Sequence, residues 1–254
     1  MAFRIVFSPS IIFAAVMLMA PFIGSIAGES TDLNQSDSTD AQRATVQKIR
    51  GRFGITNAPV DKNGVITGIR DYLDNYIPLP MAGDDQLEWV YQFVDQNRDI
   101  FQLENPRQEL SLRYSTTSRN GLVSFDFDQV VNGIKIRNGF LGMLIIPDSA
   151  IIKSMNCKIF PQARSVNTTP NITREQAIDI ALSDTAHTGI PPEIYPNRAN
   201  VGPDPQLIIQ IRDDIPHLVW PVHVYVGGPT YYIDAHSGEV LDVINECIIE
   251  RWGK

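Results

Sequence analysis

Residues 110–160 read LSLRYSTTSRNGLVSFDFDQVVNGIKIRNGFLGMLIIPDSAIIKSMNCKIF, and this stretch decides the fold. Val123, Phe125 and Phe127 alternate with polar residues, which is the period of a strand that buries one face. The Asn-Gly pairs at 120–121 and 132–133 are signals for tight hairpin turns. The stretch therefore predicts an antiparallel meander, in which residues 140–146 form a central strand and residues 151–160 form the next one.

The first strand of this meander is expected at its beginning. Leu110, Leu112 and Tyr114 alternate with polar residues, as in a half-buried strand. A helix is predicted before it, because Asp84 and Asp85 stand where a helix cap is expected. The helix itself is indicated by apolar residues at the spacing of one helical face, namely Leu87, Val90, Tyr91 and Val94.

The second half of the chain repeats this plan. Thr173 and Gln176 have the spacing of a capping box, so a helix is expected to begin there. Four strands are predicted after it, at residues 207–211, 218–226, 231–234 and 240–244. Residues 162–170, rich in Thr, Asn and Pro, are expected to form a linker. The sequence therefore predicts the α+β class, with two helix-plus-antiparallel-sheet units in tandem.

The N-terminus has the pattern of a secretory signal peptide over residues 1–27. Arg4 precedes an apolar run over residues 11–20, and the small residues Ser25 and Ala27 stand where a signal peptidase reads. The alternative is an uncleaved membrane anchor, although the run is short for a membrane span. Residues 28–45 are mostly Ser, Thr, Asp and Gln, so a flexible leader is expected. We expect a secreted protein, extracellular or periplasmic.

The composition is that of a globular protein with an acidic balance. The chain has 254 residues, of which 43% are hydrophobic, and a formal net charge of −8. This charge provides no basic footprint for nucleic acid or for an anionic membrane, so neither is expected as a partner after signal cleavage. The oligomeric state is left open. Cys157 and Cys247 could form a disulfide in an oxidising compartment or remain two buried free thiols, and the sequence leaves both alternatives open.

Two segments resemble the parts of a known kind of propeptide. Residues 127–140, FDQVVNGIKIRNGF, are similar to the Q-x-x-x-G-x-x-V-x-x-G pattern of the fungalysin/thermolysin propeptide (FTP) domain. The positions that carry this likeness are Gln129, Asn132, Gly133 and Gly139. Residues 173–181, TREQAIDIA, and residues 231–241, YYIDAHSGEVL, resemble a PepSY domain. Its positions are Tyr232, Asp234 and Gly238.

The order of the two segments is that of the propeptide of secreted thermolysin-type zinc proteases. The resemblance implies an FTP-like domain over residues 46–161, a PepSY-like domain over residues 171–247 and a C-terminal tail over residues 248–254. Both units are then expected to be cystatin-like. Because no protease domain follows in this sequence, we expect a stand-alone propeptide-like protein.

The sequence shows no pattern typical of a catalytic or metal site, so no enzyme activity and no cofactor is expected. The histidines, His187, His217, His223 and His236, form no zinc-binding motif. Asp126 and Asp128 share a strand face, where a solvated surface explains them better than a calcium site does. No nucleophile elbow or phosphate loop is present either.

The resemblance implies a protein that binds a secreted zinc metalloprotease as an inhibitor, a folding chaperone or both. The contacts are expected at exposed strand edges, which can pair with an extended partner segment. The tail residues Ile248, Ile249 and Trp252 could enter an apolar cleft, or they could pack on the second sheet. The alternative function is an extracellular structural or interaction module on the same scaffold, with no protease partner.

Overall fold

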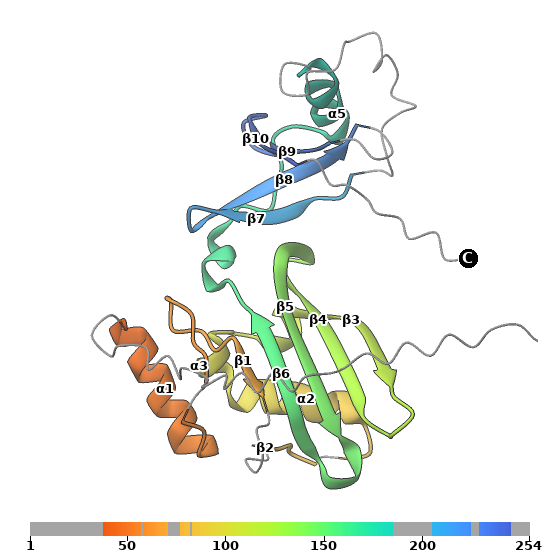
Figure 1. Cartoon of the computed structure of the whole chain (residues 1–254). Helices are drawn as coiled ribbons and strands as arrows, with labels where there is room; N and C mark the ends of the chain where they lie inside the picture. Colours follow the sequence, from red (N-terminus) through yellow and green to blue (C-terminus); the bar gives the residue numbers. More distant parts are fainter. Residues whose placement is uncertain are drawn as a thin grey trace, which may run out of the picture. The chain divides into compact units, whose positions relative to one another are not determined.

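The computed structural model describes residues 38–56, 58–70, 77–81, 83–184, 205–224 and 229–244. These residues form two α+β subdomains, residues 38–165 with several helices and residues 171–244 with one described helix, each packed on antiparallel strands (Figure 1). The α+β class predicted from the sequence is therefore confirmed. The predicted signal peptide, Cys247 and the tail residues lie outside the described residues.

The first subdomain contains the predicted meander. Its strands are β3 (Leu110–Thr117), β4 (Val123–Val131), β5 (Ile134–Ile146) and β6 (Ile151–Lys158), and each pairs antiparallel with the next. A short 3-10 helix η1 (Pro147–Ser149) connects β5 to β6. The short strands β1 (Gly68–Arg70) and β2 (Ile77–Pro78) pair with β6 on its other side. This order leaves β3 at one edge of the sheet.

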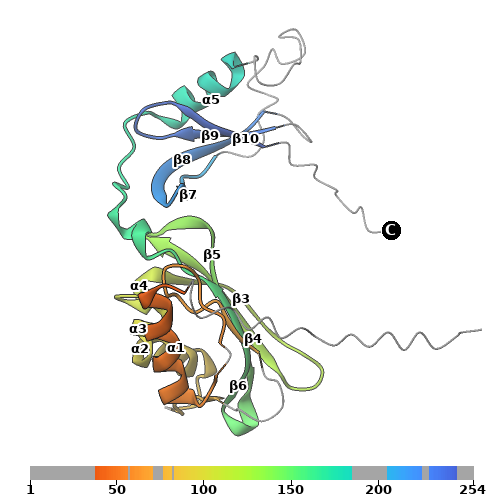
Figure 2. The ribbon, with the colours of Figure 1, turned by 60° about the vertical axis from the view of Figure 1, so that its left-hand side comes forward.

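Helices cover one face of this sheet (Figure 2). They are α1 (Asp40–Phe53), α2 (Gln86–Gln96), α3 (Arg98–Phe101) and α4 (Pro106–Glu109). The predicted cap of α2 is confirmed, because the carboxylate of Asp85 accepts the backbone N–H of Leu87 at 2.9 Å. Val90 and Phe93 from α2 are buried in one core cluster with Phe127 from β4. The helices and the sheet thus bury a shared apolar layer.

The predicted flexible leader over residues 28–45 is wrong in its last part, because helix α1 begins at Asp40. Its N-terminus has a capping box, in which Thr39 and Gln42 each accept a hydrogen bond from the other's backbone N–H. Thr45 donates from its hydroxyl to the Gly64 carbonyl at 2.6 Å, and Ile49 is fully buried. The helix has few apolar residues, and these few contacts fix it to the first subdomain.

The expectation of a half-buried first strand is also wrong for most of β3. Leu110 is buried, but 37% of Leu112 and 50% of Tyr114 remain exposed. Leu112 is already open to solvent because β3 lies at the sheet edge. The pairing with β4 then shifts register between Leu112 and Tyr114, so the alternation does not continue along the strand. The apolar alternation therefore marks an exposed edge strand and not a core strand.

The second subdomain has the predicted helix and four strands. They are α5 (Arg174–Ser183), β7 (Ile208–Arg212), β8 (Ile215–His223), β9 (Thr230–Asp234) and β10 (Val240–Ile244). The strands pair antiparallel in chain order, and α5 lies over the sheet (Figure 1). The predicted capping box between Thr173 and Gln176 is confirmed. Ala177 and Ala181, on the buried face of α5, lie in one core cluster with Val222 from β8 and Tyr231 from β9.

The two subdomains are joined by strand pairing and by a small apolar cluster. The first residues of β5 pair in parallel with β7, through Lys135 with Ile208 and Ile136 with Ile209. Around this pair lies a cluster of buried residues from both subdomains, here called the junction cluster: Val131, Ile136, Ala163, Ile209, Leu218 and Ala235. Part of the predicted linker belongs to this junction, because Ala163 lies in the 3-10 helix η2 (Pro161–Ser165) and is one of the cluster residues.

No helix among the described residues is long and apolar enough to cross a lipid bilayer.

Candidate partner-binding surface

Gln129 and Gly139, two of the FTP-like positions, lie against each other at the base of the β4–β5 hairpin. Gln129 is fully buried, and its side-chain amide accepts the backbone N–H of Phe160 at 2.9 Å and donates to the Phe160 carbonyl at 3.3 Å. A Cβ at Gly139 would come within 3.0 Å of Gln129 Cβ, Gln129 Oε1 and Ile136 Cβ. Because residue 139 has no Cβ, the Gln129 side chain has room to form its hydrogen bonds to Phe160, just after β6.

The other two FTP-like positions form the turn at the tip of the same hairpin. Asn132 and Gly133 have φ values of 50° and 79°, which are the left-handed conformations of a type I′ turn. Asn132 also donates from its side chain to the Thr168 hydroxyl at 3.1 Å, so it contacts the connection between the subdomains. These four residues shape a hairpin whose buried Ile136 belongs to the junction cluster.

Asp234, a PepSY-like position, organises the turn after β9. Its Oδ1 accepts the backbone N–H groups of His236 at 2.9 Å and Ser237 at 2.8 Å, and its Oδ2 lies 3.1 Å from His217 Nδ1. Burial raises the pKa of Asp234, but the hydrogen bonds from Ser237, His217 and His236 together outweigh it, so the pKa lies below its ordinary value. The carboxylate thus stays ionised and holds the turn at neutral pH.

Tyr232 and Gly238 complete the PepSY-like positions. Tyr232 is buried, and the guanidinium of Arg137 from β5 lies 4.2 Å from the centre of its ring. Gly238 has a φ of 79°, and a Cβ there would come within 3.3 Å of Ile180 Cδ1 in α5. Glycine at 238 thus allows the turn to pass close beneath the helix, and Tyr232 contacts the other subdomain.

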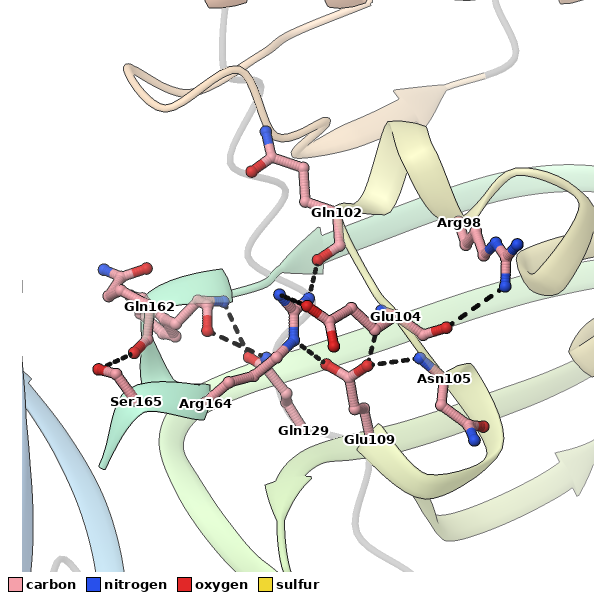
Figure 3. A network of polar contacts seen from close by, with 10 residues as sticks. Arg98, Gln102, Glu104, Asn105, Glu109, Gln129, Gln162, Arg164 and Ser165 are labelled. Atoms are coloured by element: carbon pink, nitrogen blue, oxygen red, sulfur yellow. Dashed lines mark hydrogen bonds and ion pairs between the residues drawn. The ribbon is translucent and has the colours of Figure 1, made fainter. Parts of the chain in front are cut away.

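Arg164 is the centre of a polar network that the sequence did not indicate (Figure 3). Its Nε donates to Glu109 Oε2 at 2.8 Å, and its guanidinium also contacts the Gln102 carbonyl and Glu104 Oε1. The Glu109 carboxylate accepts the backbone N–H groups of Glu104 and Asn105, each at 2.7 Å. The network holds η2 to helix α4 and to the residues just before it, so this part of the predicted linker is fixed to the first subdomain.

Strand β3 forms an exposed edge of the first subdomain's sheet. Among the described residues it pairs with β4 alone, so its other side has no strand neighbour there. Its residues after Leu110 are all exposed, and Leu112 and Tyr114 are two of the large apolar side chains that remain open to solvent. Arg113 lies between them, 3.7 Å from a carboxylate oxygen of Asp126 and of Asp128. The edge therefore combines free backbone groups with apolar side chains.

The described residues hold no arrangement with evident catalytic or metal chemistry. No group of three or more His, Cys, Asp or Glu side chains within them could hold a metal ion. His217 pairs with Asp234, and His223 Nδ1 lies 2.7 Å from the Thr230 hydroxyl. His187 lies outside the described residues. Asp126 and Asp128 are matched by Arg113 and by Lys135, whose Nζ is 3.0 Å from Asp128.

Cys157 is buried in β6, has no disulfide partner among the described residues, and its Sγ lies 2.8 Å from the Ile66 carbonyl oxygen. Burial raises the pKa of this thiol to about 12, and the negative charge of Asp61 adds to the effect. The thiolate needed for nucleophilic attack is therefore scarce at neutral pH. Because Cys247 lies outside the described residues, a disulfide between the two cysteines stays a prediction. The same holds for contacts of Ile248, Ile249 and Trp252.

The second subdomain matches the model of a known domain family. Residues 171–244 match PepSY, the peptidase propeptide and YPEB domain. PepSY is a non-catalytic domain of the propeptide and inhibitor type, and it typically occurs in extracellular or periplasmic proteins. A search of curated proteins gives no significant match. Among solved structures, the Bacillus megaterium YpeB C-terminal domain aligns at 14% identity with a TM-score of 0.33, covering 80% of this chain and 96% of that one.

The limits of the PepSY match coincide with the limits of the second subdomain. The match begins at Asn171, just before helix α5, and ends with Ile244, the last residue of β10. It therefore spans the whole second subdomain as described. The three PepSY-like positions, Tyr232, Asp234 and Gly238, lie inside this span, in β9 and the turn that follows it. The edge strand β3 and the Arg164 network lie outside it.

Proposed function

We propose that this protein is a secreted, non-catalytic, propeptide-like protein that binds a thermolysin-type metalloprotease as an inhibitor, a folding chaperone or both. The observation that carries the proposal is the PepSY match over residues 171–244. The FTP-like pattern at Gln129, Gly133 and Gly139 supports it, because it lies in the other subdomain and precedes the PepSY domain in the order of such propeptides. An inhibitor needs a rigid complementary surface and no catalytic residue.

The edge of β3 is the surface we assign to the protease. A protease binds its substrates as extended chains, and an extended strand with an open edge can pair with a partner strand through main-chain hydrogen bonds. Leu112 and Tyr114 supply apolar side chains of the kind that fill partner pockets, and tyrosine is frequent at the energetic centre of interfaces. Seven of the eight residues of the strand pair with β4, so its conformation does not depend on the partner.

The test is hydrolysis of a chromogenic peptide by a thermolysin-like protease from the same source, with and without an excess of residues 28–254. A dose-dependent loss of activity, with slow cleavage of the added protein, supports inhibition. Faster recovery of activity when the denatured protease refolds with the protein supports a chaperone. Unchanged activity together with unchanged refolding contradicts the proposal and leaves an extracellular interaction module as the better account.

A further inference from the structure

Gln210 on β7 is a buried polar side chain with an unsatisfied hydrogen-bonding atom. It is 8% exposed, and its Oε1 has no hydrogen-bond partner among the described residues. Leaving a buried acceptor without a donor destabilises a fold, and such groups are rare in native proteins. Gln210 also lines a groove of about 580 Å³. The unsatisfied acceptor therefore lies beside space that a ligand could fill.

The groove opens where two strands separate. Strand β7 pairs with β5 through Ile208 and Ile209 only, whereas its pairing with β8 continues to Arg212. On β5 the pairing with β7 ends at Ile136, where the register of β5 with β4 also shifts, and Asn138 within this irregularity has a φ of 60°. Asn138 and Gln210 both line the groove. Residues 210–212 thus have no strand partner on this side among the described strands, so an extended chain could pair with them.

The charge of the groove favours an acidic ligand. Lys158 at the end of β6 lines it, with its ammonium 5.2 Å from the centre of the Phe160 ring, and it forms no ion pair within the described part of the chain. The two acidic residues of the lining are already matched, since Asp214 pairs with Lys62 and Asp213 lies 3.9 Å from Arg212. Cationic charge therefore remains available next to Gln210.

We propose that this groove binds an extended peptide segment that carries an acidic side chain. A backbone N–H of the peptide donates to Gln210 Oε1, and its carboxylate pairs with Lys158. A single aspartate or glutamate of the peptide can supply both the backbone N–H and the carboxylate, because in an extended segment these two groups lie a few ångströms apart. The site is distinct from the β3 edge, so it does not depend on the proposed protease binding.

The experiment measures fluorescence anisotropy of a short labelled peptide of alternating threonine and valine with one central glutamate, titrated with residues 28–254. The same peptide with lysine at the centre is the charge control. We expect the glutamate peptide to bind more tightly than the lysine peptide. Gln210→Met, which keeps the side-chain length and removes the amide, is expected to weaken binding about tenfold. Lys158→Gln is expected to weaken it by a similar factor.

Lys153→Gln is the matched control, since Lys153 is exposed on the same strand as Lys158 and does not line the groove. It is expected to leave the affinity unchanged. The thermal midpoint of Gln210→Met is expected to stay equal or rise, because the unsatisfied acceptor is gone. Absence of binding by the wild type, equal affinity for the two peptides, or unchanged affinity in Gln210→Met would overturn the proposal. Equal competition by free phosphate and by peptide would also overturn it, since that result indicates a simple anion site.

Discussion

Glu109 and Glu104 both contact Arg164, but the structure predicts that only Glu109 contributes much to stability. The Glu109 side chain is 10% exposed and is bound to the Arg164 Nε at 2.8 Å, whereas the Glu104 side chain is 78% exposed and 3.4 Å away. Glu109 also accepts two backbone N–H groups, those of Glu104 and Asn105, which have no other acceptor in this network. Glu109→Ala therefore removes a buried charge and leaves three donors without their acceptor.

The magnitude follows from burial. Removing one partner of a buried ion pair costs about 3–5 kcal/mol. Because 27% of the Arg164 side chain is exposed and water can solvate it, we expect the low end, about 3 kcal/mol. Glu104→Ala is expected to change the free energy of unfolding by no more than about 0.5 kcal/mol. For a chain of this length, 1 kcal/mol corresponds to about 2–4 °C, so Glu109→Ala lowers the thermal midpoint by about 6–12 °C.

The assay is thermal unfolding followed by circular dichroism, with urea titration as the independent measurement of the free energy. Glu109→Gln is the informative third variant, because its amide oxygen can still accept a backbone N–H while the charge is lost. It is expected to fall between Glu109→Ala and the wild type. Equal midpoints for Glu109→Ala and Glu104→Ala would refute the reasoning, since burial would then not decide the value of the pair.

Three further predictions concern packing and titration. Gly139→Ala is expected to destabilise the protein by about 1–3 kcal/mol, because the added Cβ would meet Gln129 and Ile136. Gly51→Ala, on the open surface of α1, should instead stabilise it by about 0.5 kcal/mol. Urea titration measures the free energy of unfolding of both variants and distinguishes the two signs. The lowered pKa of Asp234 predicts that its charge stabilises the fold above about pH 4 and that this contribution is lost as pH falls through the folded-state pKa. The stability deficit of Asp234→Asn should then shrink below about pH 4, and a deficit that stays constant to lower pH contradicts the assignment. In the reduced protein, Cys157, whose pKa is raised to about 12, should resist iodoacetamide in the native fold at pH 8 and react after denaturation, as followed by mass spectrometry of its peptide. Rapid labelling of the reduced native protein would contradict its burial.

Much of the fold could be predicted because it depends on local signals. The Asn-Gly turn at 132–133 adopts the positive φ values that the pair favours, and Asp85 caps α2 as expected. The sequence does not predict helix α1, because its composition is polar and the contacts of Thr45 and Ile49 that hold it are made to residues elsewhere in the chain. Local composition does not report such contacts.

The candidate surfaces depend on longer-range features that the sequence does not display. Leu112 is exposed because β3 lies at the sheet edge, and Tyr114 follows a register shift, whereas alternation alone predicts burial for both. The Arg164–Glu109 pair joins residues 55 positions apart, which no local pattern indicates. The unsatisfied Oε1 of Gln210 becomes visible only when the surroundings of β7 are known.

Binding to a catalytically inactive thermolysin-type protease is the most direct test of the central claim. We compare the wild-type protein with a Leu112→Lys, Tyr114→Lys variant of the β3 edge by biolayer interferometry, because lysine on an edge strand opposes strand pairing. Ile215→Lys is the control, since Ile215 is 57% exposed and lies on β8, away from β3. The account predicts saturable binding by the wild type and by Ile215→Lys, and binding at least about tenfold weaker by the edge variant. Equal binding by all three proteins, or no binding by the wild type, would contradict it.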